Sequence, residues 1–201
     1  MIKKDIILST IIFVLSATFL IAIIYNLQLK NYYGLFWMCW TAIFIIILGI
    51  RIKSPYLILS QIIILAVPDI LWTFDALTSI FMEKSLLGII DPFIDRPLFG
   101  KILFLQHSYT VPLSLIALSR IKIKKDKRIL LISFVEILIF FFLTLILIPP
   151  TESVNCVHKT CANIFPNPLT HKIIWFSFMF ASITLAYLVI TSLNFLKDKK
   201  K

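Results

Sequence analysis

The stretch "YLILSQIIILAVPDILWTFDAL", residues 56–77, combines an apolar run of membrane-spanning length with two carboxylates. An α-helix needs about 20 apolar residues to cross the hydrocarbon core of a bilayer, so this stretch predicts a transmembrane helix. Asp69 and Asp75 flank Trp72 within it. A carboxylate at membrane depth is costly unless it pairs, faces water or takes up a proton. The same stretch therefore predicts a polar site inside the membrane.

The composition of the whole chain agrees with a membrane location. Of its 201 residues, 60% are hydrophobic and 15% charged, whereas soluble domains carry about 25% charged residues. Five further apolar runs predict spans at residues 6–28, 34–50, 98–119, 128–148 and 173–195. The first run is too long for the core of a signal peptide, so we expect a retained helix. We therefore expect an all-α fold, a six-span transmembrane helical bundle, with residues 1–201 forming a single integral-membrane domain.

The net charge of +10 raises the question of a nucleic-acid partner, which the distribution of the charge answers. Fourteen of the 20 basic residues fall at residues 3–4, 51–53, 120–128 and 197–201. Six spans place all four segments on one side, and the positive-inside rule makes that side, with both termini, cytoplasmic. The basic clusters thus indicate membrane lipids as partners, through anionic headgroups, and they argue against nucleic acid.

The two long connections, residues 78–97 and 149–172, then lie on the outer side. The second contains "NCVHKTC", with Cys156 and Cys161. Their spacing with His158 does not match a zinc site, which needs four ligands, so we predict no metal. A Cys156–Cys161 disulfide suits the oxidising outer face of a bacterial plasma (inner) membrane, where we place the protein. Cys39, in the second span, is expected to be a small buried hydrophobe.

The direction of the spans allows the depth of their polar residues to be calculated. At 1.5 Å per residue, Asp69 lies about 12 Å below the outer edge of the core, and His107 about 10 Å below the same edge. Asp69 and His107 therefore share a level, and an imidazole can donate to a carboxylate. With Tyr109 as a further hydroxyl, we expect an outward-facing polar pocket; Asp75 lies near its edge.

Structural explanations stay open for the same residues. Asp69 also fits a hydrogen-bonded clamp between helices, and Trp72 fits an interfacial anchor. Trp37 and Trp40, near the start of the second span, are typical of an interfacial aromatic belt. Glu136 lies about 10 Å above the inner edge by the same rise. It fits either a proton relay with the outer carboxylates or a protonated packing residue.

Three short motifs, "DILWTFD", "LFLQHSYTVPL" and "SVN", occur in this order over residues 66–195. In this respect the chain resembles a group of uncharacterised bacterial polytopic membrane proteins. That group has Phe before the histidine and Trp after the asparagine, where this chain has Gln106 and Cys156. The resemblance implies no activity, but it implies a common set of site residues: Asp69, Trp72, Asp75, His107 and Asn155.

Two functional classes follow from these residues. One is a membrane-embedded enzyme for a lipid or lipid-linked substrate, with His107 as general acid or base and Asp69 orienting it. The other is a small proton-coupled transporter that uses the same carboxylates. A non-catalytic structural or sensory protein is a third reading, so whether the chain is an enzyme stays open, as do its cofactor and oligomeric state. The candidate catalytic residues are Asp69, Asp75 and His107, and the candidate binding residues are Trp72, Tyr109, Glu136 and Asn155.

Overall fold

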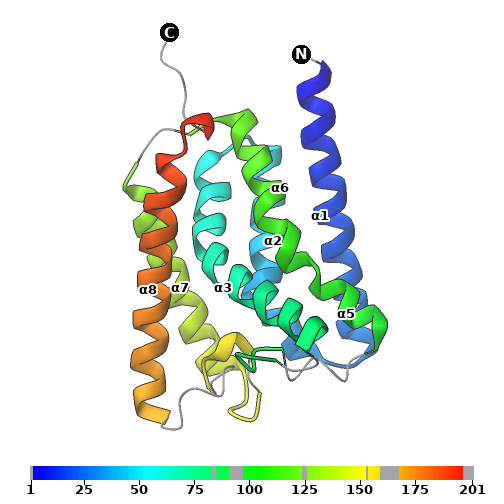
Figure 1. The fold of residues 1–201 in the computed structure, drawn as a ribbon, viewed down its shortest axis with the longest axis vertical. Coiled ribbons are helices and arrows are strands. Elements are labelled where there is room, and N and C mark those ends of the chain that lie inside the picture. Colours follow the sequence, from blue (N-terminus) through cyan, green and yellow to red (C-terminus); the bar gives the residue numbers. More distant parts are fainter. Residues whose placement is uncertain are drawn as a thin grey trace.

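The computed structural model describes residues 2–82, 85–90, 97–123, 126–152, 154–158 and 168–196. It is a bundle of helices that run alternately in opposite directions (Figure 1). The α-helices are α1 (Ile2–Gln28), α2 (Met38–Arg51), α3 (Pro55–Met82), α5 (Leu98–Phe104), α6 (Gln106–Ile121), α7 (Arg128–Leu147) and α8 (Pro168–Ser192). Short 3-10 helices are η1 (Tyr32–Phe36), η2 (Val154–Cys156) and η3 (Asn194–Leu196).

Within the described residues, five helices are long and apolar enough to cross a membrane: Ile6–Gln28, Pro55–Met82, Phe99–Ile121, Arg128–Leu147 and Thr170–Ser192. The sixth, α2, has only 14 residues, about 21 Å at 1.5 Å per residue. Its predicted first part, residues 34–37, belongs instead to η1 and to an extended residue, Trp37. The expected all-α bundle and its multi-pass membrane character are thus confirmed, with a second helix that is shorter than predicted.

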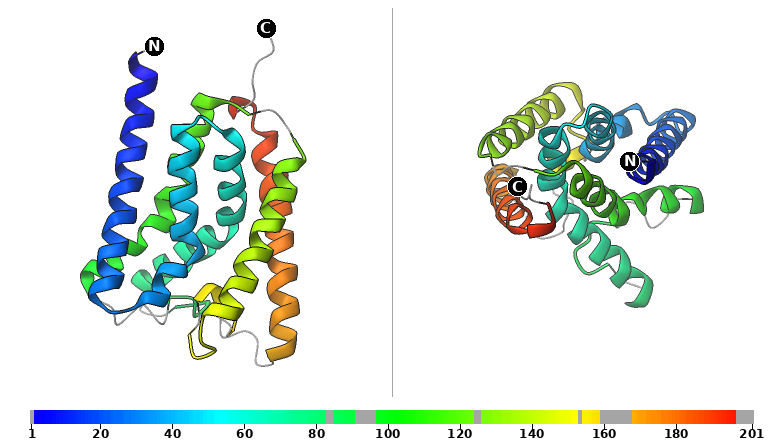
Figure 2. Two further views of the ribbon diagram at one scale, coloured as in Figure 1. Left: turned by 180° about the vertical axis from the view of Figure 1, so that it is seen from behind. Right: turned by 90° about the horizontal axis from the view of Figure 1, so that it is seen from above.

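The start of α1, η3 after α8, and the helix ends at the α2–α3 and α6–α7 connections lie at one end of the bundle (Figures 1 and 2). We call this the basic end, because Arg51, Arg120 and Arg128 lie there. Asp126 accepts hydrogen bonds at this end from Arg128 Nε (2.8 Å) and from the Tyr56 hydroxyl (2.9 Å). These contacts hold the pKa of Asp126 well below its usual range. The opposite end, formed by residues 29–37, 85–90 and 154–158, is called the loop end.

Helix α3 occupies the centre of the bundle. It packs against α2, α6, α7 and α8, and every side chain from Ile58 to Leu65 is at most 2% exposed. A helix that is apolar on all sides is stable only when it is surrounded, which explains this position. Its last turns leave the bundle (Figure 2), and Phe81 is 81% exposed there. Polar groups in the middle of α3 can therefore be satisfied only by its neighbouring helices.

The fourth span is interrupted at Leu105. α5 ends at Phe104 and α6 begins at Gln106, and the two helices diverge in direction (Figure 1). Pro112, by contrast, lies inside a continuous α6. Because of this interruption, Gln106 and His107 occupy the first turn of α6, in the half of the bundle nearer the loop end.

Candidate functional site

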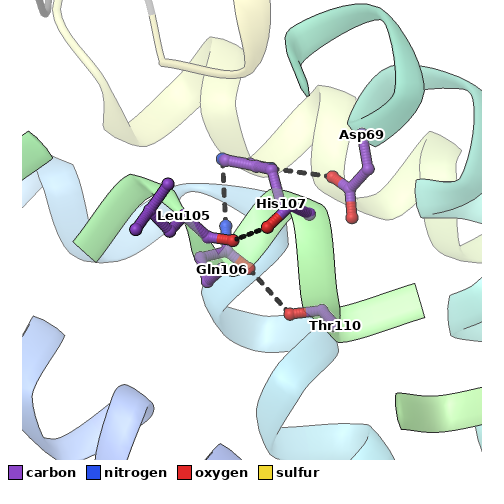
Figure 3. A network of polar contacts seen from close by, with 6 residues as sticks. Asp69, Leu105, Gln106, His107 and Thr110 are labelled. Atoms are coloured by element: carbon purple, nitrogen blue, oxygen red, sulfur yellow. Dashed lines mark hydrogen bonds and ion pairs between the residues drawn. The ribbon is translucent and has the colours of Figure 1, made fainter. Parts of the chain in front are cut away.

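Asp69 and His107 meet between α3 and α6, as expected from their calculated depths. His107 Nδ1 lies 2.7 Å from Asp69 Oδ1 (Figure 3). The Asp69 side chain is 3% exposed and that of His107 is 12% exposed. A carboxylate buried to this extent among apolar helices needs a partner, and this imidazole is the partner of one of its oxygens.

Gln106 determines which nitrogen of His107 carries the proton. The Gln106 amide nitrogen lies 2.9 Å from His107 Nε2, and the Thr110 hydroxyl donates to Gln106 Oε1 at 3.0 Å (Figure 3). An amide NH₂ group only donates, so Nε2 of His107 accepts and the ring proton lies on Nδ1. Nδ1 of His107 then donates to Asp69 Oδ1. Gln106 was not among the predicted site residues, although its place directly before His107 in the sequence was a signal for it.

Trp72, one turn after Asp69 on α3, packs on the face of the His107 ring. Its ring stacks on that of His107, with centroids 4.6 Å apart and an interplanar angle of 27°. Phe104 packs on Trp72 with centroids 5.7 Å apart. The imidazole is therefore held by two hydrogen bonds in its plane and an aromatic ring on its face. This restraint is the kind that positions an acid–base group.

The Asp69–His107 pair lies at the wall of a cavity of about 480 Å³. The wall is built from the first turn of α2, the middle of α3, the α5–α6 junction, the loop-end half of α8, and two loops. The wall is mainly apolar, and Phe178 both lines it and is 40% exposed on the outside of the bundle. The lining residues with polar or aromatic side chains are Trp37, Cys39, Trp40, Asp69, Trp72, Phe104, His107, Asn155, Cys156, His171, Trp175 and Phe178.

Asp69 keeps one unused hydrogen-bonding atom at this wall. Its Oδ2 is buried and has no hydrogen-bond partner. Cys39, a buried free thiol on α2, is an electrostatic neighbour of Asp69. An unsatisfied buried carboxylate oxygen is unusual enough to require an explanation. A proton, or a ligand group in the adjoining cavity, would supply the missing interaction.

Asp75 has a different environment from Asp69 and does not line the cavity. Its carboxylate accepts hydrogen bonds from the Ser85 hydroxyl (2.8 Å) and from the amides of Leu87 (2.7 Å), Ile89 (2.9 Å) and Ile90 (3.2 Å). With 0% exposure and four donors, it anchors residues 85–90 to α3. Leu87 and Ile89 of this anchored loop cover the cavity. The geometry supports a positioning role, and a catalytic role for Asp75 stays a prediction.

Asn155 joins three elements at the loop end. Its side-chain oxygen accepts from the Met38 amide at 2.8 Å, and its amide donates to Phe36 O at 2.9 Å and to the Thr144 hydroxyl at 3.1 Å. Its backbone oxygen accepts from Trp175 Nε1 at 2.9 Å. Its φ of 52° lies in the left-handed region, which asparagine tolerates better than most residues. Asn155 therefore fixes the start of α2, the end of α7 and the start of α8 around the cavity.

Cys156 adjoins this junction. It is disulfide-bonded, but Cys161 lies outside the described residues, so the Cys156–Cys161 pairing stays a prediction. His171 Nε2 lies 2.7 Å from Cys156 O and places a second imidazole at the cavity wall. Sequence analysis did not assign His171 to the site. No group of three or more potential metal ligands occurs among the described residues.

Two of the candidate binding residues lie apart from the cavity. The Tyr109 hydroxyl pairs with that of Thr18 at 2.7 Å and joins α6 to α1. Both carboxylate oxygens of Glu136 on α7 accept from the Gln61 amide nitrogen, at 2.9 and 2.8 Å. This contact joins α7 to α3. Neither residue lines the cavity. Both contacts fit interhelical hydrogen bonds, and binding roles for these residues stay predictions.

Comparisons with protein families, with curated proteins and with solved structures found no match to this chain. The class of protein is therefore defined by the fold and the cavity alone. It is an all-α, multi-pass membrane bundle with an Asp–His pair at the wall of an aromatic cavity.

Proposed function

We propose that the protein takes an amphipathic molecule, a lipid or a lipid-linked substrate of the outer leaflet, into the cavity and presents it to the Asp69–His107 pair. One observation carries this proposal: a cavity of about 480 Å³, with a mainly apolar wall, adjoins a buried carboxylate with an unused oxygen. Ligand sites typically combine an apolar lining with a few polar groups in this way, over about 300–1,000 Å³.

The arrangement at His107 narrows the acid–base chemistry that the pair could perform. Both ring nitrogens are engaged, Nδ1 by Asp69 and Nε2 by Gln106. A substrate proton can reach Nε2 only after the Gln106 amide turns away. Asp69 Oδ2, by contrast, has no hydrogen bond to lose. Asp69 is thus the better candidate for contact with the substrate, and His107 the better candidate for positioning it, which reverses the roles expected from sequence.

The test is to fill the cavity without changing the site. Ile174→Trp enlarges a residue that lines the cavity. Ile173→Trp is a matched control, because Ile173 is the adjacent residue of α8, is 62% exposed and does not line the cavity. Both variants and the wild type are purified from their native membrane in a mild detergent. Their co-purifying lipids are then compared by mass spectrometry.

We expect a lipid species that is enriched with the wild type and with Ile173→Trp and is depleted with Ile174→Trp. If all three proteins carry the same lipids, the proposal is wrong. A His107→Gln variant then separates binding from chemistry. A binding protein keeps the species unchanged, whereas an enzyme accumulates a substrate that the wild type converts.

A proton-coupled transporter is the second candidate, and the Gln61–Glu136 contact in the half nearer the basic end favours it. Gln61 Oε1 is buried without a hydrogen-bond partner, so polar groups with unused capacity occur in both halves of the bundle. Uptake into liposomes driven by a pH gradient, and lost in Glu136→Gln, would support this function. Equal uptake by wild type and Glu136→Gln would contradict it.

A further inference from the structure

All four tryptophans of the chain line the one cavity described above. They come from three helices and from a residue that precedes α2: Trp37, Trp40 in α2, Trp72 in α3 and Trp175 in α8. The interfacial-belt interpretation does not hold for Trp40, which is 5% exposed. Since no tryptophan of the sequence lies elsewhere, all four indole rings contribute to the wall of this cavity.

Two of these rings have fixed positions. Trp72 is stacked on the His107 ring, and Trp175 donates its indole N–H to Asn155 O and packs on Phe141 with centroids 5.2 Å apart. An indole that is held in place offers a preorganised surface, so little conformational freedom is lost when a ligand binds to it. The face of an indole ring carries partial negative charge and attracts cations.

The acidic side chain of the lining favours a cation, as the indole faces do. Asp69 is the single acidic side chain that lines the cavity, and no lysine or arginine lines it among the described residues. Gln106 donates to Nε2 of His107 and Nδ1 donates to Asp69, so these hydrogen bonds engage both ring nitrogens and leave Asp69 Oδ2 unpaired. Among the described residues Asp69 is thus the one acidic group of the lining, in a chain whose net charge is +10, and a cation would satisfy its unpaired oxygen. A low-dielectric wall strengthens the attraction between this carboxylate and a cation.

We propose that the ligand of this cavity carries a positively charged nitrogen, an amine or a quaternary ammonium group, on an apolar tail. The inference rests on the proposed function, because it names the headgroup of the amphiphile that the cavity takes up. The nitrogen lies near Asp69 and against the indole rings, and the tail follows the aliphatic part of the lining. An anionic headgroup meets only repulsion from Asp69, and a neutral headgroup leaves the carboxylate without a counter-charge.

The tryptophans themselves provide the measurement. The full chain, in maltoside micelles at pH 8, is titrated with decyltrimethylammonium and, separately, with decyldimethylamine N-oxide, while tryptophan emission is recorded. The two probes share the tail and nearly the same headgroup shape, but only the first has a net positive charge. We expect saturable emission changes with both probes and an affinity at least about tenfold higher for the ammonium.

Asp69→Asn tests the carboxylate itself. Asparagine keeps an oxygen that accepts the hydrogen bond from His107 Nδ1, so we expect the fold to be preserved. The acidic group, however, is removed. We expect the ammonium affinity to fall to that of the N-oxide, whose own affinity is unchanged. Glu152→Gln is the matched control, because it removes an acidic side chain that does not line the cavity, and it should retain the preference for the cation.

The outcomes separate this inference from the proposed function. Equal wild-type affinities for the two probes overturn the cationic headgroup and leave amphiphile binding intact. No saturable change with either probe overturns both. The comparison of probes on the wild type decides the matter even if Asp69→Asn does not fold. A preference for the cation that survives in Asp69→Asn also contradicts the assignment, because the charge must then come from another group.

Discussion

At the scale of single residues, the site depends on how a buried carboxylate is satisfied. Asp69 and Asp75 are six residues apart on one helix, yet their carboxylates are satisfied differently. Asp75 has four donors, whereas Asp69 has one partner and an unused oxygen. A fully satisfied carboxylate stabilises structure, and a partly satisfied one has capacity left for a ligand or a proton. The contrast is the strongest residue-level reason to place function at Asp69.

His107→Ala should destabilise the protein strongly, by about 3–5 kcal/mol, because it leaves a buried charge without its partner. Ser108→Ala is the neighbouring control, since the Ser108 hydroxyl bonds only the exposed Leu105 O in the structure. The measurement is thermal unfolding of both purified variants in the same detergent. Equal unfolding temperatures for His107→Ala and wild type would show that Asp69 is neutral or solvated and needs no imidazole.

Asp75→Asn should loosen residues 85–90 while the bundle stays folded. Asparagine keeps one acceptor oxygen and has an NH₂ group in place of the other, which cannot accept. An NH₂ group at the Oδ2 position loses the hydrogen bonds from Ser85, Ile89 and Ile90, and one at the Oδ1 position loses that from Leu87. Because hydrogen bonds to charged groups contribute roughly 1.5–3 kcal/mol, protection of these amides should fall by at least about tenfold. Hydrogen exchange read by mass spectrometry, with α7 as the internal reference, measures this. Unchanged protection would mean that other contacts hold the loop.

At the scale of elements, the cavity exists because separate helix ends are fixed to one another. Asn155 connects the residues before α2 to the end of α7 and the start of α8 through one side chain and one carbonyl. The interruption at Leu105 orients the first turn of α6 towards α3. Neither device could be read from hydropathy, because both depend on local backbone conformation rather than on the periodicity of apolar residues.

Substitutions of Asn155 should separate its side-chain and backbone contributions. Asn155→Ala loses the contacts to Met38, Phe36 and Thr144 and keeps a β-carbon at a φ of 52°, so we expect a loss of roughly 2–4 kcal/mol. Asn155→Gly loses the same contacts but accepts the left-handed backbone, and should be about 1 kcal/mol more stable than the alanine variant. Thermal unfolding of the two variants checks both values. A glycine variant no more stable than the alanine variant would contradict the backbone contribution.

At the scale of the whole molecule, the sequence predicted the architecture well and the site only in part. Apolar runs predict the membrane spans, and basic loops predict the direction in which each span runs. The bundle could therefore be predicted, and the shared level of Asp69 and His107 could be calculated from the helical rise. The short α2 could not, because the run continues through Tyr32–Phe36 although the helix does not. Trp40 was read as interfacial, and Gln106 and His171 were missed. Each of these depends on which way a side chain points within the bundle.

The sidedness of the membrane is a prediction for the whole chain. Arg51→Cys at the basic end and Glu152→Cys at the loop end, each in a Cys39→Ala background, should react with a membrane-impermeant maleimide from opposite sides. In intact cells we expect labelling at residue 152 only, and labelling at residue 51 after permeabilisation, because basic segments are retained on the cytoplasmic side. The reverse pattern would invert the membrane orientation and move the cavity to the inner leaflet.

The anchored loop has a consequence for how a ligand arrives. Four hydrogen bonds to Asp75 keep Leu87 and Ile89 at the cavity wall, whereas on the flank Phe178 both lines the cavity and is 40% exposed on the outside of the bundle. We therefore expect an amphiphile to enter past Phe178, where the cavity wall faces the hydrocarbon, rather than through the anchored loop. The solvent from which the site is loaded is then the bilayer itself, and occupancy follows the mole fraction of an amphiphile in the membrane rather than its concentration in water.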